Sequence, residues 1–218
     1  MKTFVRENGL TLVMTALFLL ALAGQIVAGW TVYNDQQEQL GASQVSIGQY
    51  VTTGHFGEAV FENWESEFLQ MGLFVLLTVW LRQKGSPESK PLQGRQAVDR
   101  QPDARRSGAP WLIRTGGLAG RLYRHSLSIA LLGLFGVSFA LHVITGAAAF
   151  SAEQVAHGAA PVSPLGYLLT PQLWFESFQN WQSEFMSIGA LVVLAIFLRE
   201  RGSPESKPVD APHAETGG

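Results

Sequence analysis

Glu67 and Glu184 occupy the positions that most favour chemistry, because each carboxylate opens a long apolar run. Each glutamate lies 15 residues before the arginine that closes its run, Arg82 or Arg199. On a straight helix this separation is about 22 Å. If the arginines mark the inner edge of a membrane, both carboxylates lie in the outer part of the hydrocarbon core. Ionisable groups there are costly and usually face a bundle interior or a water-filled cavity, so the pair could bind a cation or relay protons.

A layer of polar residues is predicted at about the depth of the two glutamates. Counting along each apolar run places four further side chains at this depth or one helical turn further out. The predicted layer consists of Gln25, Asn63, Glu67, His142, Asn180 and Glu184. Two simpler alternatives stay open: both glutamates could lie solvated among the outer lipid headgroups, and His142 could serve as a hydrogen-bonding group in helix packing. The short apolar cores that follow both glutamates favour the headgroup alternative.

Three tryptophans are predicted to anchor helices at the membrane–water interfaces. They are Trp64, Trp181 and Trp80. The histidines of the loops and the tail are isolated and lack metal-ligand spacing. The sequence contains no cysteine, no glycine-rich phosphate loop and no nucleophile elbow. We therefore expect no catalytic residue, no cofactor and no metal site, and we expect that the protein is not an enzyme.

The elements that must position these residues are four apolar stretches. Only 15% of the residues are charged and 47% are hydrophobic, so we expect an all-α membrane protein with four transmembrane helices. The predicted spans are residues 10–30, 67–82, 125–149 and 184–201. The predicted outer loops with their amphipathic leads are residues 31–66 and 150–183. A cytoplasmic linker is predicted at 92–124, with an interfacial segment at 111–123, and a disordered tail at 209–218.

Both outer loops lead into helices whose starts are visible in the sequence. Thr53 and Thr170 are predicted N-caps, and Asn34 indicates a turn after the first span. In the first lead, apolar residues recur at helical spacing, and acidic residues, among them Glu58 and Glu65, occupy the opposite face. We expect this acidic face to be in contact with water.

The chain contains one unit twice. Residues 63–91, NWESEFLQMGLFVLLTVWLRQKGSPESKP, return without a gap as residues 180–208, NWQSEFMSIGALVVLAIFLRERGSPESKP, at an offset of 117 positions. Repeat 1 covers residues 1–91 and repeat 2 covers residues 125–208. Because each repeat has two helices, both enter the membrane from the same side and should be related by a pseudo-twofold axis along the membrane normal. The expected fold is a pseudo-symmetric four-helix bundle.

The distribution of charge predicts the orientation. All fifteen lysines and arginines fall at the N-terminus, in residues 82–124 or after Leu198, and neither outer loop holds one. The positive-inside rule then places both termini and the linker in the cytoplasm. The arginines of the linker are interspersed with aspartates, which favours contact with anionic lipids over binding of nucleic acid.

The pattern RENGL…WESEFLQMG…LRQKGSPESKP resembles a family of uncharacterised bacterial integral membrane proteins, grouped as a domain of unknown function. The resemblance covers both repeats and implies a multi-pass protein of the bacterial inner membrane, without implying an activity or a cofactor. We expect a non-enzymatic structural or accessory envelope protein that could associate with itself or with another membrane protein. The alternative is a small transporter or channel that conducts protons or cations through Glu67 and Glu184.

Overall fold

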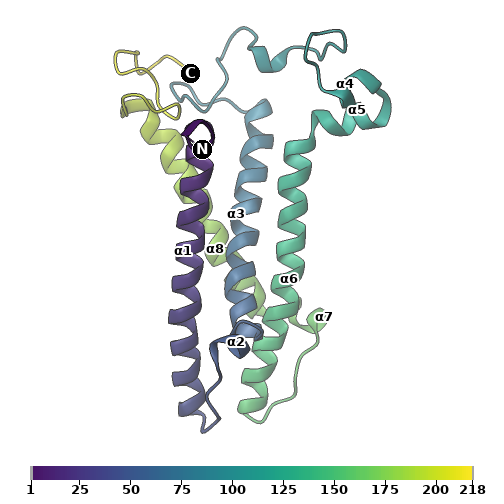
Figure 1. The fold of residues 1–218 in the computed structure, drawn as a ribbon, viewed down its shortest axis with the longest axis vertical. Coiled ribbons are helices and arrows are strands. Elements are labelled where there is room, and N and C mark those ends of the chain that lie inside the picture. Colours follow the sequence, from purple (N-terminus) through teal and green to yellow (C-terminus); the bar gives the residue numbers. More distant parts are fainter. Residues whose placement is uncertain (1, 218) are drawn as a thin grey trace. The chain divides into compact units, whose positions relative to one another are not determined.

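Helices make up most of the structure, a computed structural model that describes residues 2–217, and no strand occurs within this range. The elements, labelled in Figure 1, are α1 (Lys2–Gln39), α2 (Ile47–Tyr50), α3 (Gly54–Trp80), the 3-10 helix η1 (Ala97–Asp99), α4 (Trp111–Thr115), α5 (Gly117–Arg124), α6 (Ser126–Ala156), α7 (Pro164–Tyr167) and α8 (Pro171–Phe197). The chain divides into two compact units. The first comprises Met1–Phe61 and Ala140–Trp174, and the second comprises Glu62–Phe139 and Phe175–Gly218.

In the first unit, α1 and α6 extend further than the sequence predicts. α1 continues past residue 30 to Gln39, and α6 continues past residue 149 to Ala156. The added residues are mostly polar or small, so their composition resembles that of a loop. A solvated helix end tolerates such side chains, and the helix therefore continues through them. The turn predicted at Asn34 is wrong, because Asn34 lies inside α1.

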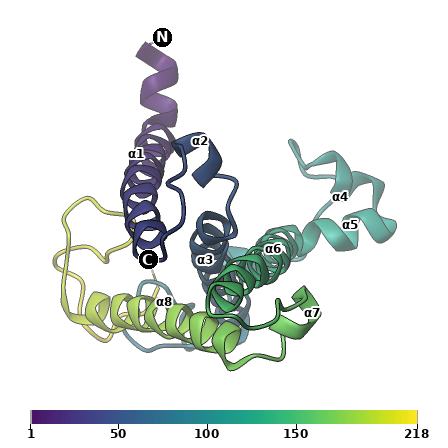
Figure 2. The ribbon, with the colours of Figure 1, turned by 90° about the horizontal axis from the view of Figure 1, so that it is seen from below.

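The same hydrogen-bonded latch closes the loop after α1 and the loop after α6. The Asn34 side chain accepts from the Val45 backbone N–H at 2.7 Å and donates to the Val45 carbonyl at 3.0 Å. The Ser151 hydroxyl makes the equivalent pair of bonds with Val162, both at 2.9 Å. These residues are 117 positions apart, and the latches hold α2 beside α1 and α7 beside α6 (Figure 2). Asn34 and Ser151 differ in type, so the latch is a structural equivalence that sequence identity alone does not reveal.

Short polar side chains cap the helices that follow each latch. Ser46 and Ser163 cap α2 and α7, each accepting from a backbone N–H three residues later. Thr53 and Thr170 accept from the backbone N–H at the third position of α3 and of α8, at 3.2 and 3.5 Å. Both threonines therefore take the N-cap role that the sequence indicates.

Two tyrosines form the core of the first unit, each against a glycine of the helix before it. Tyr50 and Tyr167 are almost fully buried, with exposed fractions of 1% and 0%. A Cβ atom on Gly29 would collide with the Tyr50 hydroxyl, and one on Gly146 would lie 2.7 Å from the Tyr167 ring. Glycine at these positions allows each tyrosine to approach the helix backbone.

In the second unit, glycine also brings two helices together. A Cβ atom on Gly72 of α3 would lie 2.9 Å from the Leu132 side chain of α6, and Leu131 beside it is buried. Small residues at such contacts let helix backbones approach closely, which is typical of helix packing in membranes.

Each GSPESKP segment of the second unit forms the same turn after its helix. Gly85 and Gly202 have φ angles of +87° and +88°, a left-handed conformation that favours glycine. Ser89 and Ser206 accept a hydrogen bond from the backbone N–H six residues earlier, at 2.9 and 3.0 Å. The glycine and the second serine of the repeated motif therefore shape the turn that follows each helix, which ends at Trp80 or Phe197.

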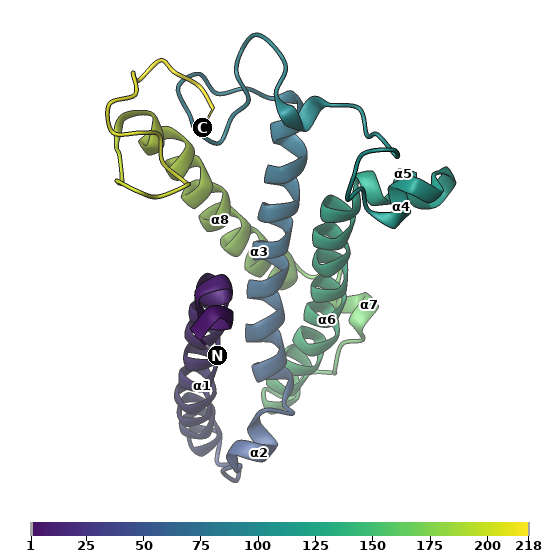
Figure 3. The ribbon, with the colours of Figure 1, turned by 45° about the horizontal axis from the view of Figure 1, so that its top comes forward.

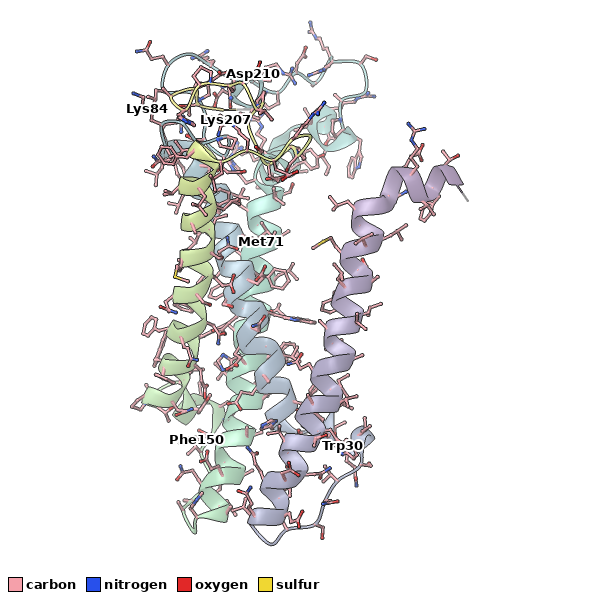
Figure 4. All side chains as sticks on the ribbon, turned by 90° about the vertical axis from the view of Figure 1, so that its left-hand side faces the viewer. Trp30, Met71, Lys84, Phe150, Lys207 and Asp210 are labelled. Carbon is pink, nitrogen blue, oxygen red and sulfur yellow. The ribbon has the colours of Figure 1, made fainter. Side chains whose placement is uncertain are left out.

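The lysine of the second GSPESKP segment holds the tail. Lys207 is 1% exposed. Its Nζ atom donates to the backbone carbonyls of Pro212, His213 and Glu215, at 3.2, 3.0 and 3.0 Å. Figure 4 labels Lys207 and Asp210 among these loops, and the Gly217 N–H donates to the Ser86 carbonyl at 3.0 Å. The sequence predicts a tail without fixed structure. It does not reveal the carbonyl partners of the Lys207 ammonium group, because these partners come together only in the folded unit.

The interfacial segment predicted at 111–123 consists of two short helices that lie side by side (Figure 3). Gly116 and Gly117 separate α4 from α5 with φ angles of +66° and +60°. An apolar groove of about 400 Å³ lies where α5 meets α6 and is lined by Leu112, Ala119, Leu122, Tyr123, Ser126, Ile129 and Ala130. The last turns of α4 and α5 carry Arg114, Arg121 and Arg124, as expected for helices at a membrane surface.

Within residues 2–217, three helices are long and apolar enough to cross a membrane: α1, α6 and α8. α3 is as long as α8, with 27 residues, but it is not among the helices that meet this criterion. The fourth predicted span therefore stays a prediction. None of the residues in the most apolar stretch of α1 is buried, so in a bilayer these side chains would contact lipid or another protein.

The Tyr50 packing yields a stability prediction. Gly29→Ala should lower the free energy of unfolding by about 1–3 kcal/mol relative to Gly24→Ala, because the new methyl group displaces a buried ring. Gly24 is the matched control, since it lies on α1, a Cβ atom added there would meet no atom within 4 Å, and its replacement gains the same helix propensity. Thermal unfolding in detergent measures the difference, and equal midpoints for the two variants would contradict this packing.

Candidate functional site

A fully buried carboxylate, Glu65, joins α3 to α8 within the second unit. Glu65 is 0% exposed. Its Oε1 atom accepts hydrogen bonds from the Ser177 hydroxyl at 2.8 Å and from the Trp181 Nε1–H at 3.3 Å. Burying a carboxylate away from water is costly unless donors replace the lost hydration, and here both donors come from α8. The predicted solvated position of Glu65 is wrong, because the face of α3 that carries it packs against another helix.

Aromatic rings pack against Trp181, one of the donors to the Glu65 carboxylate. Trp181 makes edge-to-face contacts with Phe178, at 5.5 Å between ring centroids, and with Phe135, at 6.3 Å. Such contacts fix the orientation of the indole ring. Trp181 is therefore a positioned hydrogen-bond donor, and the interfacial anchoring that the sequence indicates for it stays a prediction.

Glu67 and Glu184, the two glutamates singled out by the sequence, lie next to each other in the second unit. Their carboxyl groups are close enough to interact electrostatically. A carboxylate is only an acceptor, so a hydrogen bond between these two groups would require a proton on one of them. Glu67 and Glu184 are equivalent positions of the two repeats, 117 residues apart. The arrangement can hold one proton between two oxygens and can exchange it.

A second pair of equivalent carboxyl groups meets outside the apolar runs. Glu88 and Glu205, the glutamates of the two GSPESKP segments, also lie close enough to interact electrostatically. Burial raises the pKa of Glu88 above its ordinary value of 4.5, and the neighbouring Glu205 carboxylate raises this pKa further. The glutamate that is identical in both segments thus contacts its own counterpart.

The first unit holds a separate polar cluster. Glu58 of α3 accepts a hydrogen bond from the Tyr167 hydroxyl at 3.2 Å, and a carboxylate oxygen of Glu58 lies within 4.8 Å of a ring nitrogen of His142. His142 and Tyr167 are both 0% exposed. Of these three residues, only His142 is among the site residues that the sequence predicts.

A family model described as a domain of unknown function, DUF6766, matches residues 1–218. The chain belongs to the DUF6766 family. Comparison with the curated proteins and with the solved structures finds no match. Membership of DUF6766 confirms the resemblance found in the sequence. Because the family description names no activity, the function must be argued from the geometry of this chain.

The other predicted site residues of this DUF6766 chain are distributed over the two units. Gln25 is exposed on α1 of the first unit. In the second unit, Asn63 is exposed and Asn180 donates to a carbonyl of its own helix at 3.1 Å. Trp64 is half-buried and Trp80 is 69% exposed. Of the predicted layer, the structure therefore brings together the two glutamates Glu67 and Glu184.

Sequence reasoning missed Glu65, Ser177, Glu58 and Tyr167 as members of polar clusters. The position equivalent to Glu65 is Gln182, and the position equivalent to Glu58 is Phe175, so the duplication does not point to these acids. A serine and a tyrosine near helix ends have many structural roles, and their partners are 112 and 109 residues away in the chain. A search for acids on the packed face of α3 would have found Glu65.

The hydrogen bonds to Glu65 yield a second stability prediction. Ser177→Ala removes a donor from a buried charged group, which should cost about 1–3 kcal/mol of unfolding free energy. Ser187→Ala is the control, because Ser187 is exposed on the same helix and its hydroxyl donates to a carbonyl of that helix. Thermal unfolding in detergent should separate the variants, and a Ser177→Ala protein as stable as the control would show that this bond is unimportant.

The Glu88–Glu205 pair predicts a pH dependence of stability. Since the pKa of Glu88 is raised in the folded state, the folded protein binds more protons than the unfolded chain, and stability falls as the pH rises from about 4.5 through the raised pKa. Glu88→Gln should therefore unfold at a higher temperature than wild type at pH 7.5 and nearly together with it at pH 4. Glu200→Gln, at an exposed position nearby, should follow wild type throughout. An unchanged pH profile for Glu88→Gln would contradict the assignment.

Proposed function

We propose that this DUF6766 chain is a multi-pass protein of the bacterial inner membrane, with four transmembrane helices in two parallel repeats and both termini in the cytoplasm. The distribution of lysine and arginine supports this orientation. Contacts between equivalent residues support the repeat symmetry: Glu67 meets Glu184, and Glu88 meets Glu205. A residue that touches its own counterpart lies beside the symmetry axis, so both pairs fit a pseudo-twofold axis along the membrane normal.

Within this architecture, the function that the geometry supports best is proton or cation conduction through the carboxyl groups of α3 and α8. The observation that carries the proposal is the proximity of the Glu67 and Glu184 carboxyl groups. A carboxyl pair that shares one proton can accept and release it with little rearrangement, which suits a relay or an ion-binding step. Glu65, buried two residues before Glu67, supplies a further acceptor on the same helix.

The rival function is the structural or accessory envelope role that the sequence alone favours. A purely structural helix pair gains little from adjacent carboxyl groups, because apolar residues of similar volume would avoid the cost of dehydrating them. The two functions share their partners: the lipid bilayer, anionic headgroups at Arg114, Arg121 and Arg124, and a second copy or another membrane protein along α1. Neither includes a catalysed reaction.

Flux measurements in proteoliposomes test the proposal. The wild-type protein should dissipate an imposed pH gradient, read with an internal pH-sensitive dye, and the double variant Glu67→Gln/Glu184→Gln should abolish this flux because neither amide exchanges a proton. Parallel runs with Na⁺ and K⁺ gradients distinguish proton from cation movement. Glu153→Gln, at an exposed carboxylate on α6, should conduct like wild type.

Folding of each variant is checked by thermal unfolding before reconstitution. Absence of flux for the wild-type protein across pH 5–8 and in both salts would overturn the conduction proposal and favour the structural role. Wild-type flux that persists in the double variant would place the pathway elsewhere and would equally overturn the role assigned to these two glutamates.

A further inference from the structure

The cluster of Glu58, His142 and Tyr167 in the first unit has no part in the proposed pathway, yet it combines groups that bind metal ions. An imidazole nitrogen together with a carboxylate oxygen suits first-row transition metals and zinc. Bonds of about 2.1 Å at a tetrahedral angle hold two such ligand atoms about 3.4 Å apart. The two atoms lie within 4.8 Å of each other here, so small side-chain movements would bring both to one ion.

The cluster has the supporting contacts that metal ligands need. The Tyr167 hydroxyl donates to Oε1 of Glu58 at 3.2 Å, which orients the carboxylate. Hydrogen bonds of this kind orient ligands and raise metal affinity. Gly146, one helical turn after His142, keeps the approach open, because a Cβ atom there would lie 3.0 Å from Oε1 of Glu58 and 2.7 Å from the Tyr167 ring.

Comparison of the two repeats indicates that this cluster exists once per chain. At the offset of 117 positions, His142 corresponds to Gln25 and Glu58 corresponds to Phe175. Tyr167 corresponds to Tyr50, whose hydroxyl pairs with the Nδ1 atom of His55 at 3.4 Å. The packing tyrosine is thus common to both repeats, whereas the candidate ligands Glu58 and His142 have no equivalents of the same type.

We propose that Glu58 and His142 bind a divalent transition-metal ion, with Tyr167 positioning the carboxylate. The expected stoichiometry is one ion per chain.

Metal binding by the purified full-length protein, prepared without a histidine tag and stripped with a chelator, tests the proposal. Titration with Zn²⁺ and with Mn²⁺, followed by calorimetry and by metal analysis after gel filtration, should give one saturable site. Glu58→Gln and His142→Gln should abolish it, and Tyr167→Phe should weaken it about 10–100-fold. His157→Ala removes an exposed histidine of the same unit and should bind like wild type.

The glutamine that replaces His142 is the residue at the equivalent position of the other repeat, which favours retention of the fold. Thermal unfolding with and without Zn²⁺ gives a second readout, since an ion that binds the folded state raises its stability. A wild-type protein that binds neither ion would overturn the proposal. So would Glu58→Gln and His142→Gln proteins that fold and bind like wild type.

Discussion

A carboxylate removed from water must receive hydrogen bonds from the protein, and Glu65 receives them from two side chains of α8. This requirement sets the rotation of α3 against α8 within the second unit. At about 100° per residue, Glu65 and Glu67 extend to either side of Ser66, which is itself buried. A small residue at the centre of the contact lets the helices approach, and the acids on its flanks both reach α8. The contact between Glu67 and Glu184 is thus coupled to the burial of Glu65.

Structural devices are shared by the two repeats, as are Glu67 and Glu184, whereas Glu65 and the candidate metal ligands are not. The loop latches, the serine and threonine caps, the tyrosine against glycine and the GSPESKP turn all recur at the same offset. Glu65, Glu58 and His142 have no equivalent of the same type. After a duplication, the contacts that hold each helical pair remain under the same constraint in both copies, while a site needs only one set of ligands. This pattern is consistent with an asymmetric site on a symmetric scaffold.

Much of the helical architecture can be predicted from local patterns of the sequence. The caps at Thr53 and Thr170 were predictable because an N-cap is a property of a few neighbouring residues. The pair Glu67 and Glu184 was singled out because both positions recur in the repeat. The position of Glu65 was predicted wrongly. The helical periodicity of the sequence shows which residues lie on the same face of α3 as Glu65, but it does not show what packs against that face. The contact of Glu58 with Tyr167 joins residues 109 positions apart on different repeats, and no local pattern records such a partner.

The bond between Gly217 and Ser86 spans 131 positions, and it has a consequence for biogenesis. At about 5–20 residues per second, synthesis of the intervening chain takes on the order of ten seconds. Throughout this interval the turn after α3 exists without the tail segment that later covers it. Lys207 is synthesised only shortly before the residues whose carbonyls surround its ammonium group. Residues 207–217 therefore complete a packing arrangement whose other members are made first. The second unit can finish folding only after these residues have emerged, whatever order its helices follow into the membrane.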